Sequence, residues 1–253
     1  MIDLENVSKS YDKGQPAVSH ATLHVDKGEF VFVVGSSGSG KSTLIKLLLK
    51  ELDATAGTIV VNGQKLNTMK RRQIAKYRRK LGVVFQDFRL LKDRNVYENV
   101  AFAQRVIGRP TRVIRKRVPE VLTEVGLAEK YKSPVTELSG GEQQRIAIAR
   151  ALLLSPEVII CDECVSALDV SIQAQILNLL KDLQKEFSTA YLFISHDIGV
   201  IHYMSDFIVV INRGRIVEQG EGSQLIRTPK DDYTKRLIAS SCSTGEGCVC
   251  GVR

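Results

Sequence analysis

Nine residues between a predicted strand and a predicted helix constrain the fold of this chain more than any other feature. They are Gly35, Ser36, Ser37, Gly38, Ser39, Gly40, Lys41, Ser42 and Thr43, and they match the pattern G-x-x-x-x-G-K-[ST]. An apolar run over 30–34 precedes them, and a helical pattern over 42–50 follows. Glycines in such a loop let backbone N–H groups curl around a phosphate, and the helix N-terminus adds a positive dipole. We therefore expect these nine residues to bind a nucleotide, with Lys41 at the β- and γ-phosphates and Ser42 also as a Mg²⁺ ligand.

A second apolar run, over 158–161, ends in two carboxylates, Asp162 and Glu163. At the carboxyl end of a strand in a phosphate-loop fold, the first acid can hold Mg²⁺ through water. The next acid can polarise an attacking water as a general base. We expect Asp162 to act on the metal and Glu163 to be catalytic; an acidic surface pair after a strand is the alternative.

The order of the predicted elements indicates an α/β fold with a mostly parallel sheet. Apolar strand-like runs at 30–34, 81–86, 158–161, 191–195 and 207–211 alternate with helical patterns. Short strands are expected over 2–25 and 57–63, which predicts an antiparallel β subdomain near the N-terminus. The stretch from about 90 to 155 is mainly helical in pattern and predicts an inserted helical subdomain, within which Pro119 is expected to begin a new helix.

The net charge of +8 is unevenly distributed. Between Lys70 and Arg117 there are 16 basic and 3 acidic residues, densest at 70–80. Such a stretch favours an anionic partner, which could be lipid head groups, nucleic acid or an acidic protein surface; a solvated helix face is the alternative. Interleaved aromatic residues are few, so nucleic acid is the weakest of these.

The apolar runs, the N-terminal residues and the cysteines indicate the cellular compartment of the protein. No uncharged apolar run approaches the ~18 residues of a membrane span, and residues 1–12 do not form a signal peptide. We expect a cytoplasmic protein with reduced thiols. Of the five cysteines, Cys242, Cys248 and Cys250 crowd the tail. They could bind zinc or an iron–sulfur cluster, although a loose tail is expected.

One segment, Leu138–Gln143 (LSGGEQ), narrows the class of protein. It resembles the signature motif of ATP-binding cassette (ABC) ATPases. Further motifs stand at family-like positions: Gln86 resembles the Q-loop glutamine, Tyr11 the aromatic residue that stacks on adenine, and His196 the switch histidine. The segment 166–169, ending in Asp169, resembles the D-loop. The resemblance covers about residues 2–238 and makes 239–253 a separate, Cys-rich tail.

The resemblance implies a head-to-tail dimer, formed with a second copy or a sister subunit, that encloses two ATP molecules. Four residues of the signature motif, together with Asp169, would complete the nucleotide site across that dimer: Ser139, Gly140, Gly141 and Glu142. Gln86 would bind Mg²⁺ and sense the nucleotide, and it would also take part in catalysis together with Glu163 and His196. The helical subdomain would drive an integral membrane partner at the cytoplasmic face of the plasma membrane. A cassette that binds ATP without hydrolysing it is disfavoured, because the residues expected to carry out hydrolysis are all present: Lys41, Asp162, Glu163 and His196.

Two subfamilies are resembled in different parts of the chain. Residues 82–103 look like FtsE-type cell-division ATPases, whose membrane partner is FtsX. The sequence from Cys161 onward, including residues 229–237, looks like that of oligopeptide and dipeptide importer ATPases, which work with a peptide permease. A lineage of mixed character, a recombinant and a designed sequence all fit this division. We rank the FtsE-like function first, because the Q-loop region contacts the partner, and the peptide importer second. A soluble ABC ATPase acting on nucleic acid is a remote third.

Overall fold

The computed structural model describes residues 1–11, 16–195 and 204–242, with backbone alone for residues 241 and 242. The chain divides into two units. The first unit comprises residues 1–74 and 190–253, and the second comprises residues 75–189. Helix α2 (Arg71–Arg78) runs across the division. Each unit is described by itself.

The first unit contains an antiparallel sheet with the strand order β2-β1-β4-β5. Its central strand pairs with both β2 and β4. Burial alternates along β2, so one face of the sheet is covered and the other faces solvent. The expected N-terminal β subdomain is confirmed. The strands are β1 (Ile2–Lys9), β2 (Val18–Val25), β4 (Ala56–Val61) and β5 (Gln64–Lys65).

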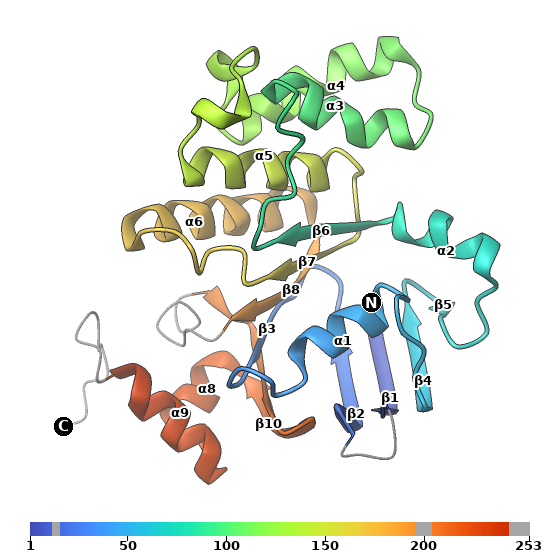
Figure 1. The fold of residues 1–253 in the computed structure, drawn as a ribbon. Helices are drawn as coiled ribbons and strands as arrows, with labels where there is room; N and C mark the ends of the chain where they lie inside the picture. Colours follow the sequence, from blue (N-terminus) through green and yellow to red (C-terminus); the bar gives the residue numbers. More distant parts are fainter. Residues whose placement is uncertain (12–15, 196–203, 243–253) are drawn as a thin grey trace. The chain divides into compact units, whose positions relative to one another are not determined.

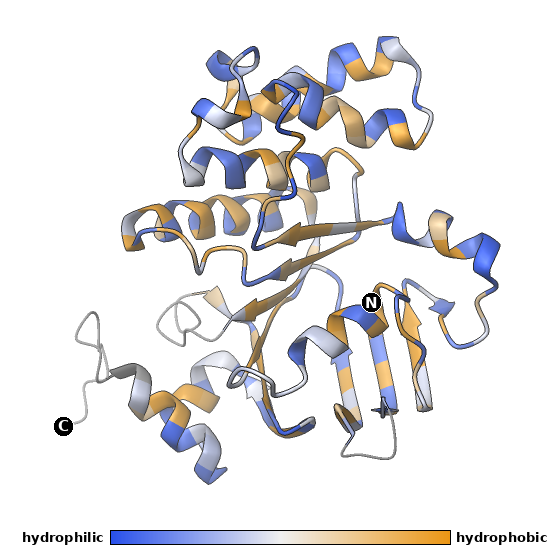
Figure 2. Ribbon diagram, in the orientation of Figure 1, coloured by the Kyte–Doolittle hydropathy of each residue, from blue (hydrophilic) through white to orange (hydrophobic). Residues whose placement is uncertain are grey.

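The strand that leads into the phosphate loop, β3 (Phe30–Val34), is buried along its whole length. It pairs in parallel with β8 (Ala190–Ser195) and with β9 (Phe207–Asn212), and β10 (Arg215–Glu221) is antiparallel to β9. Aromatic rings of β3 and β8 pack in two pairs with centroids 4.9 Å apart: Phe30 stacks on Tyr191, and Phe32 lies tilted against Phe193. A continuous apolar run is what a strand covered on both faces requires, and Figure 2 shows β3 in hydrophobic colours.

Three helices complete the described part of the first unit beside α2: α1 (Lys41–Leu48), α8 (Gly222–Arg227) and α9 (Asp232–Cys242). Figure 1 shows α8 and α9 following β10. The boundary placed at residue 238 falls inside α9, which continues for four more residues. Cys248 and Cys250 lie outside the described residues.

The second unit pairs β6 (Leu81–Phe85) in parallel with β7 (Val158–Asp162). Gly82 lets α5 lie close to β6, because a Cβ atom there would come within 3.3 Å of the Ala151 Cβ and 2.8 Å of the Ile159 side chain. The helices of this unit, together with two 3₁₀ turns at Ala128–Lys130 and Val135–Glu137, are α3 (Val96–Val106), α4 (Thr111–Glu124), α5 (Gly140–Leu152) and α6 (Val170–Phe187). The mostly parallel α/β class is confirmed.

The expectation that Pro119 begins a new helix is wrong, because α4 continues through it. Proline lacks the N–H that would bond the carbonyl four residues earlier, which belongs to Arg115. Both residues are exposed, so water can satisfy that carbonyl. Val118 and Val121 on the other side of the helix are buried and hold it in place.

Candidate functional site

The phosphate loop of the first unit connects β3 to α1, and glycine is required at both of its ends. A Cβ atom on Gly35 would lie 2.1 Å from the Ile211 carbonyl oxygen, and one on Gly40 would lie 2.4 Å from that of Ala17. Gly40 also has φ = 112°, a conformation that other residues rarely adopt, and it is the N-cap of α1. The loop is thus pressed against neighbouring backbone, and its geometry depends on the missing side chains.

Lys41 is buried within this loop with only 5% of its surface exposed. Its Nζ donates hydrogen bonds to the carbonyl oxygens of Gly35 (2.7 Å) and Ser36 (2.9 Å). Ser39 is also buried, and within the part of the chain that the structure describes its Oγ has no hydrogen-bond partner. A buried cation beside a buried, unsatisfied hydroxyl group fits an anionic ligand such as a phosphate.

The other loop residues face outward or into α1. Ser36, Ser37, Gly38 and Ser42 are exposed, whereas Thr43 is buried. The Tyr11 hydroxyl lies 3.2 Å from the Thr43 Oγ1, and 55% of the Tyr11 surface is exposed. The Tyr11 side chain is therefore held at the first turn of α1 while remaining open to solvent, as a residue that stacks on a base requires.

A residue that was not predicted also contacts the loop. The backbone N–H of Ser36 donates a 2.8 Å hydrogen bond to the hydroxyl oxygen of Tyr233, in α9. The two residues are 197 positions apart. The sequence around either residue does not predict such a contact. Tyr233 does lie in the importer-like segment 229–237.

In the second unit, the β6–β7 register brings the predicted metal and catalytic groups to one edge. Phe85, the last residue of β6, is the partner of Asp162, the last residue of β7, so Gln86 and Glu163 directly follow the ends of two adjacent parallel strands. Glu163 has φ = 46°, and its carbonyl oxygen accepts hydrogen bonds from the N–H (3.2 Å) and Oγ (2.8 Å) of Ser166. A tight turn therefore follows the strand and holds the backbone of Glu163 in a left-handed conformation.

The Q-loop after Gln86 is tied to α5. Phe88 and Arg89 have φ of 53° and 47°, and the Arg89 guanidinium lies 3.5 Å from the Phe85 ring centroid. The Arg150 Nη1 on α5 donates a 2.6 Å hydrogen bond to the Arg89 carbonyl oxygen. Two consecutive left-handed residues are strained, and these contacts stabilise them.

The predicted Mg²⁺ ligands offer only oxygen atoms: the Ser42 hydroxyl, the Gln86 amide and the Asp162 carboxylate. Mg²⁺ prefers such hard donors and usually retains water and substrate phosphate as further ligands. Among the described residues, no group of three or more His, Cys, Asp or Glu side chains could hold a metal ion. The chemistry of these oxygen donors fits Mg²⁺.

The predicted signature motif forms the N-terminus of α5. Ser139 is the N-cap, and a capping box joins it to Glu142: the Ser139 N–H donates to the Glu142 Oε2 (2.9 Å), and the Glu142 N–H donates to the Ser139 Oγ (3.3 Å). Gly141 allows α6 to approach, because a Cβ atom there would lie 2.6 Å from the Ile172 Cγ2. Asp169, exposed, is the N-cap of α6 and makes no side-chain capping bond.

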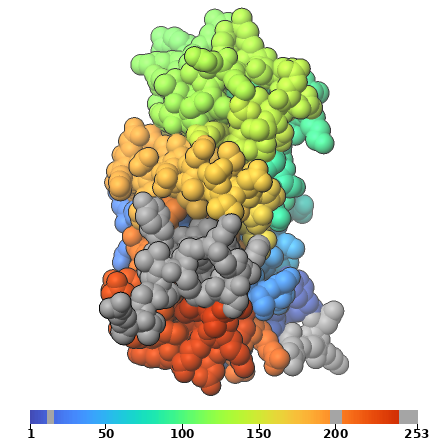
Figure 3. Space-filling model, turned by 90° about the vertical axis from the view of Figure 1, so that its left-hand side faces the viewer, coloured from blue at the N-terminus to red at the C-terminus, as the bar shows by residue number. Residues whose placement is uncertain are grey.

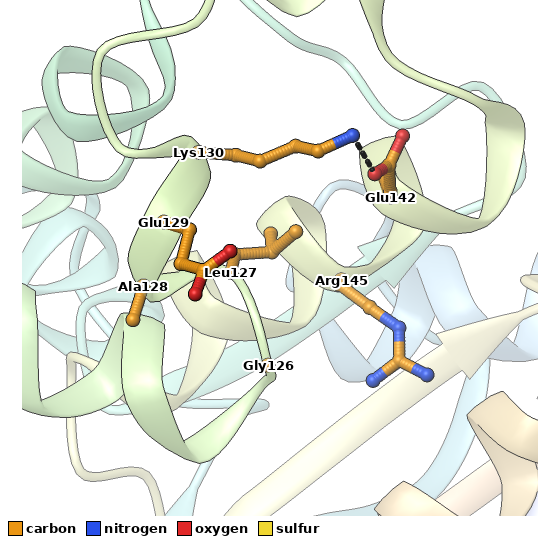
Figure 4. Close-up of a pocket in the computed structure, with 7 residues that line it drawn as sticks. All are labelled: Gly126, Leu127, Ala128, Glu129, Lys130, Glu142 and Arg145. Carbon is orange, nitrogen blue, oxygen red and sulfur yellow. Dashed lines mark ion pairs between the residues drawn. The ribbon is translucent and has the colours of Figure 1, made fainter.

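An open pocket of about 590 Å³ lies beside this motif. Figure 4 shows Lys130 reaching across it to form an ion pair with Glu142. The hydrogen bond from Lys130, followed by that from the Ser139 backbone, lowers the pKa of Glu142. On the same helix, the Arg145 Nη1 donates a 3.0 Å hydrogen bond to the Val125 carbonyl oxygen. The carboxylate beside the signature serine is thus compensated by a neighbouring cation.

The remaining predicted residue, His196, lies outside the described residues. Among the described helices, none is both long and apolar enough to cross a membrane. The predicted roles of the residues above remain predictions, and the geometry shows where each one lies within its own unit.

A strand, phosphate loop and helix with a buried lysine define the class as a P-loop nucleoside triphosphatase. A model of one family, described as "ABC transporter", matches residues 18–166, which is more than half of the chain. The chain belongs to the ABC transporter family and is its ATP-binding, ATP-hydrolysing type of subunit. The family resemblance predicted from the sequence is confirmed.

The chain is similar to curated relatives over almost its whole length. It is 40% identical to the methionine import ATP-binding protein MetN 2 of Pectobacterium atrosepticum over 243 residues, which are 94% of this chain and 72% of the relative. It is 39% identical to MetN of Escherichia coli O157:H7 over 244 residues, covering 95% of this chain and 71% of the relative.

Two solved structures share the fold. CbiO1 of Clostridium perfringens, part of the ABC transporter complex cbiONQ, superposes with a TM-score of 0.83 and 30% identity, covering 88% of this chain and 89% of its own. The dimeric ATP-binding cassette MJ0796, bound to ADP and Pi, gives a TM-score of 0.78 and 33% identity, covering 87% and 98%.

Proposed function

We propose that the chain is the ATP-hydrolysing subunit of an ABC importer that moves methionine or a related amino acid. The observation that carries this proposal is the similarity to methionine import proteins over more than nine-tenths of the chain. These relatives favour the importer alternative over the FtsE-like cell-division function that we ranked first. They favour an amino acid over a peptide as the cargo.

The first unit binds the nucleotide in this proposal. Tyr11 stacks on adenine, and the loop from Gly35 to Thr43 surrounds the phosphates with backbone N–H groups. Lys41 is the positive charge at the β- and γ-phosphates, where a buried cation stabilises developing negative charge most strongly. The unsatisfied Ser39 Oγ supports this role, because a phosphate oxygen would be its missing partner.

The second unit supplies the hydrolytic groups. Glu163 polarises the attacking water, and the oxygen atoms of Ser42, Gln86 and Asp162 are the ones that would hold Mg²⁺ when it binds with ATP. When bound, Mg²⁺ neutralises charge on the phosphate oxygens. Gln86 and Glu163 follow the paired ends of β6 and β7, which supports a direct response of the Q-loop to hydrolysis. His196 has the assisting role that the family resemblance implies.

A second copy or a sister subunit completes the machine. Ser139, Gly140, Gly141 and Glu142 of one subunit, together with Asp169, contact the ATP bound by the other. The dimeric state of MJ0796 with ADP and Pi supports this pairing. Hydrolysis then loosens the contact and passes motion to the permease.

The location follows from the partner. We place the subunit at the cytoplasmic face of the plasma membrane, attached to a permease rather than inserted. The cations of α2 and its flanks are exposed, and Figure 2 shows α2 mainly in hydrophilic colours. They support contact with an anionic surface, whether lipid head groups or acidic permease loops. Association with nucleic acid receives no support from the relatives.

The test is a membrane capture with a tagged Glu163→Gln subunit and ATP, followed by mass spectrometry. This variant retains ATP but loses its general base, so turnover falls by about 10²–10⁴-fold while the ATP-bound dimer persists. Lys41→Ala, which should bind ATP much more weakly, is the matched control.

Recovery of an amino-acid permease by Glu163→Gln, and not by the control, supports the proposal. Recovery of an FtsX-like protein instead would restore the cell-division function. Uptake of labelled methionine by vesicles containing the recovered complex then decides the cargo, and uptake of peptides alone would overturn the amino-acid assignment.

A further inference from the structure

We propose that Tyr233 is a positioning residue for Lys41 and that it acts through a single peptide group of the phosphate loop. The proposal rests on the proposed function of that loop as an ATP site. It assigns a role to α9, which lies outside the motifs of the family.

The argument starts with the peptide bond between Gly35 and Ser36. Its two polar atoms are the Gly35 carbonyl oxygen and the Ser36 N–H, and they share one rigid plane. The Lys41 Nζ donates to that oxygen at 2.7 Å, and that N–H donates to the Tyr233 hydroxyl at 2.8 Å. The tyrosine and the lysine therefore hold the same plane from opposite sides.

This arrangement determines the direction of the carbonyl that anchors Lys41. Without the Tyr233 hydroxyl, the plane loses the bond that opposes rotation, and the Ser36 N–H loses its protein acceptor. Hydrogen bonds in a chain also polarise one another, so the bond at the N–H strengthens the carbonyl as an acceptor. Loss of the Tyr233 hydroxyl should therefore make the position of the Lys41 ammonium group less well defined without removing its charge.

Tyr233 is itself held in place by β10. The Glu218 carboxylate accepts the backbone N–H groups of Lys230 (2.8 Å) and Asp231 (3.1 Å), immediately before α9 begins. The Asp231 Oδ1 then accepts the Tyr233 N–H at 2.8 Å. These backbone bonds contribute to the lowered pKa of Glu218, against the opposing effect of its burial.

The inner side of α9 gives the helix a fixed position. Leu237 and Ile238 line a small apolar cavity with Val34, Val210 and Leu225, which belong to β3, β9 and α8. The outer side carries the exposed residues Asp232, Lys235 and Arg236, and Figure 3 shows the red C-terminal helical region on the surface. One side of α9 therefore packs against the rest of the first unit, which fixes the position of Tyr233. The other side is exposed to solvent.

The test compares Tyr233→Phe, which keeps the ring and removes the hydroxyl, with Tyr131→Phe, an exposed tyrosine of the second unit. In the nucleotide-free chain, hydrogen exchange measured by mass spectrometry should be faster for peptides containing Ser36 in Tyr233→Phe and unchanged in Tyr131→Phe. Thermal unfolding and circular dichroism show whether each variant is folded. Glu218→Gln should accelerate the same exchange to a smaller extent.

The second readout is a double-mutant cycle on ADP affinity, measured by calorimetry. Tyr233→Phe should weaken ADP binding about three- to tenfold, which corresponds to the net contribution of about one hydrogen bond. In a Lys41→Met background the same change should have less than a twofold effect, because the residue that it positions is absent. A merely structural role would weaken binding equally in both backgrounds.

Equal weakening in the two backgrounds, or unchanged Ser36 exchange, would overturn the role of Tyr233. Failure of the wild-type chain to bind ADP or hydrolyse ATP would instead overturn the proposed function. The exchange experiment contains no nucleotide, so the two failures are distinguishable.

Discussion

Helices α1 and α5 both begin at a motif expected to contact phosphate, but their N-termini are completed in different ways. In α1 the N-cap is Gly40, no side chain caps the helix, and no acidic residue lies in the first turn. In α5 the N-cap is Ser139, and Glu142 in the first turn closes a capping box. Both helices are labelled in Figure 1; α1 belongs to the first unit and α5 to the second.

The difference indicates two kinds of anion contact. A helix N-terminus leaves backbone N–H groups without intrahelical partners, and a bound anion can satisfy them. In α1 this is left to a ligand or water, because glycine offers no capping atom. In α5 the Ser139 side chain already accepts a hydrogen bond from one of these N–H groups, that of Glu142. A tight, permanent nucleotide site is expected at α1, and a contact that can be made and released is expected at α5.

The largest expected effect comes from removing the cation at α1. Lys41→Ala should lower ATP turnover by about 10²–10³-fold, because a buried charge at the phosphates is lost. Phosphate release measured at saturating ATP gives the value. Lys46→Ala, which removes an exposed lysine from the same helix, should retain turnover within about twofold. A Lys41→Ala enzyme that retains activity would show that α1 is not the principal phosphate site.

An intermediate effect on stability and turnover is expected from Arg150, which lies near the C-terminus of α5. Arg150→Met leaves the Arg89 carbonyl without its donor and should lower the free energy of unfolding by about 1–3 kcal/mol. Turnover should fall as well, because the Q-loop loses its support, and Arg150→Lys should restore part of both. Urea unfolding and phosphate release measure the two quantities. Arg105→Met, which removes a surface pair with Glu98, is the control. Loss of stability with normal turnover would make Arg150 purely structural.

The smallest effect concerns the capping box. Lys130→Met removes the cation that lowers the pKa of Glu142. A carboxyl group whose pKa is lower in the folded state stabilises that state above its ordinary pKa, and the stabilisation is lost as the pH falls. The loss at neutral pH should be about 0.2–1 kcal/mol, reduced by salt because the pair is partly exposed. It should vanish well below the ordinary value of 4.5. Urea unfolding across this pH range measures it, and a pH-independent loss would contradict it.

The sequence predicted the features that depend on neighbouring residues. The phosphate loop, the carboxylates after β7 and the start of α5 are each continuous in the chain, so their spacing carries the information. The contact of Tyr233 with Ser36 was not predictable in this way, because it depends on how α9 packs against β3. Lys130 was missed for a similar reason: its partner Glu142 lies in another element. Pro119 was misjudged because exposure, which decides whether water can replace a lost helix bond, is a property of the packed molecule.

One consequence of α5 is mechanical. The helix has 13 residues, so its axis is about 20 Å long. Ser139 stands at one end of this rod, and Arg150, which holds the Arg89 carbonyl, stands near the other. A tilt of about 3° around one end displaces the other by roughly 1 Å, which is enough to break or remake a hydrogen bond. In the proposed dimer the helix would act as a lever arm, and its stiffness would determine how much of a displacement at the phosphate reaches the Q-loop.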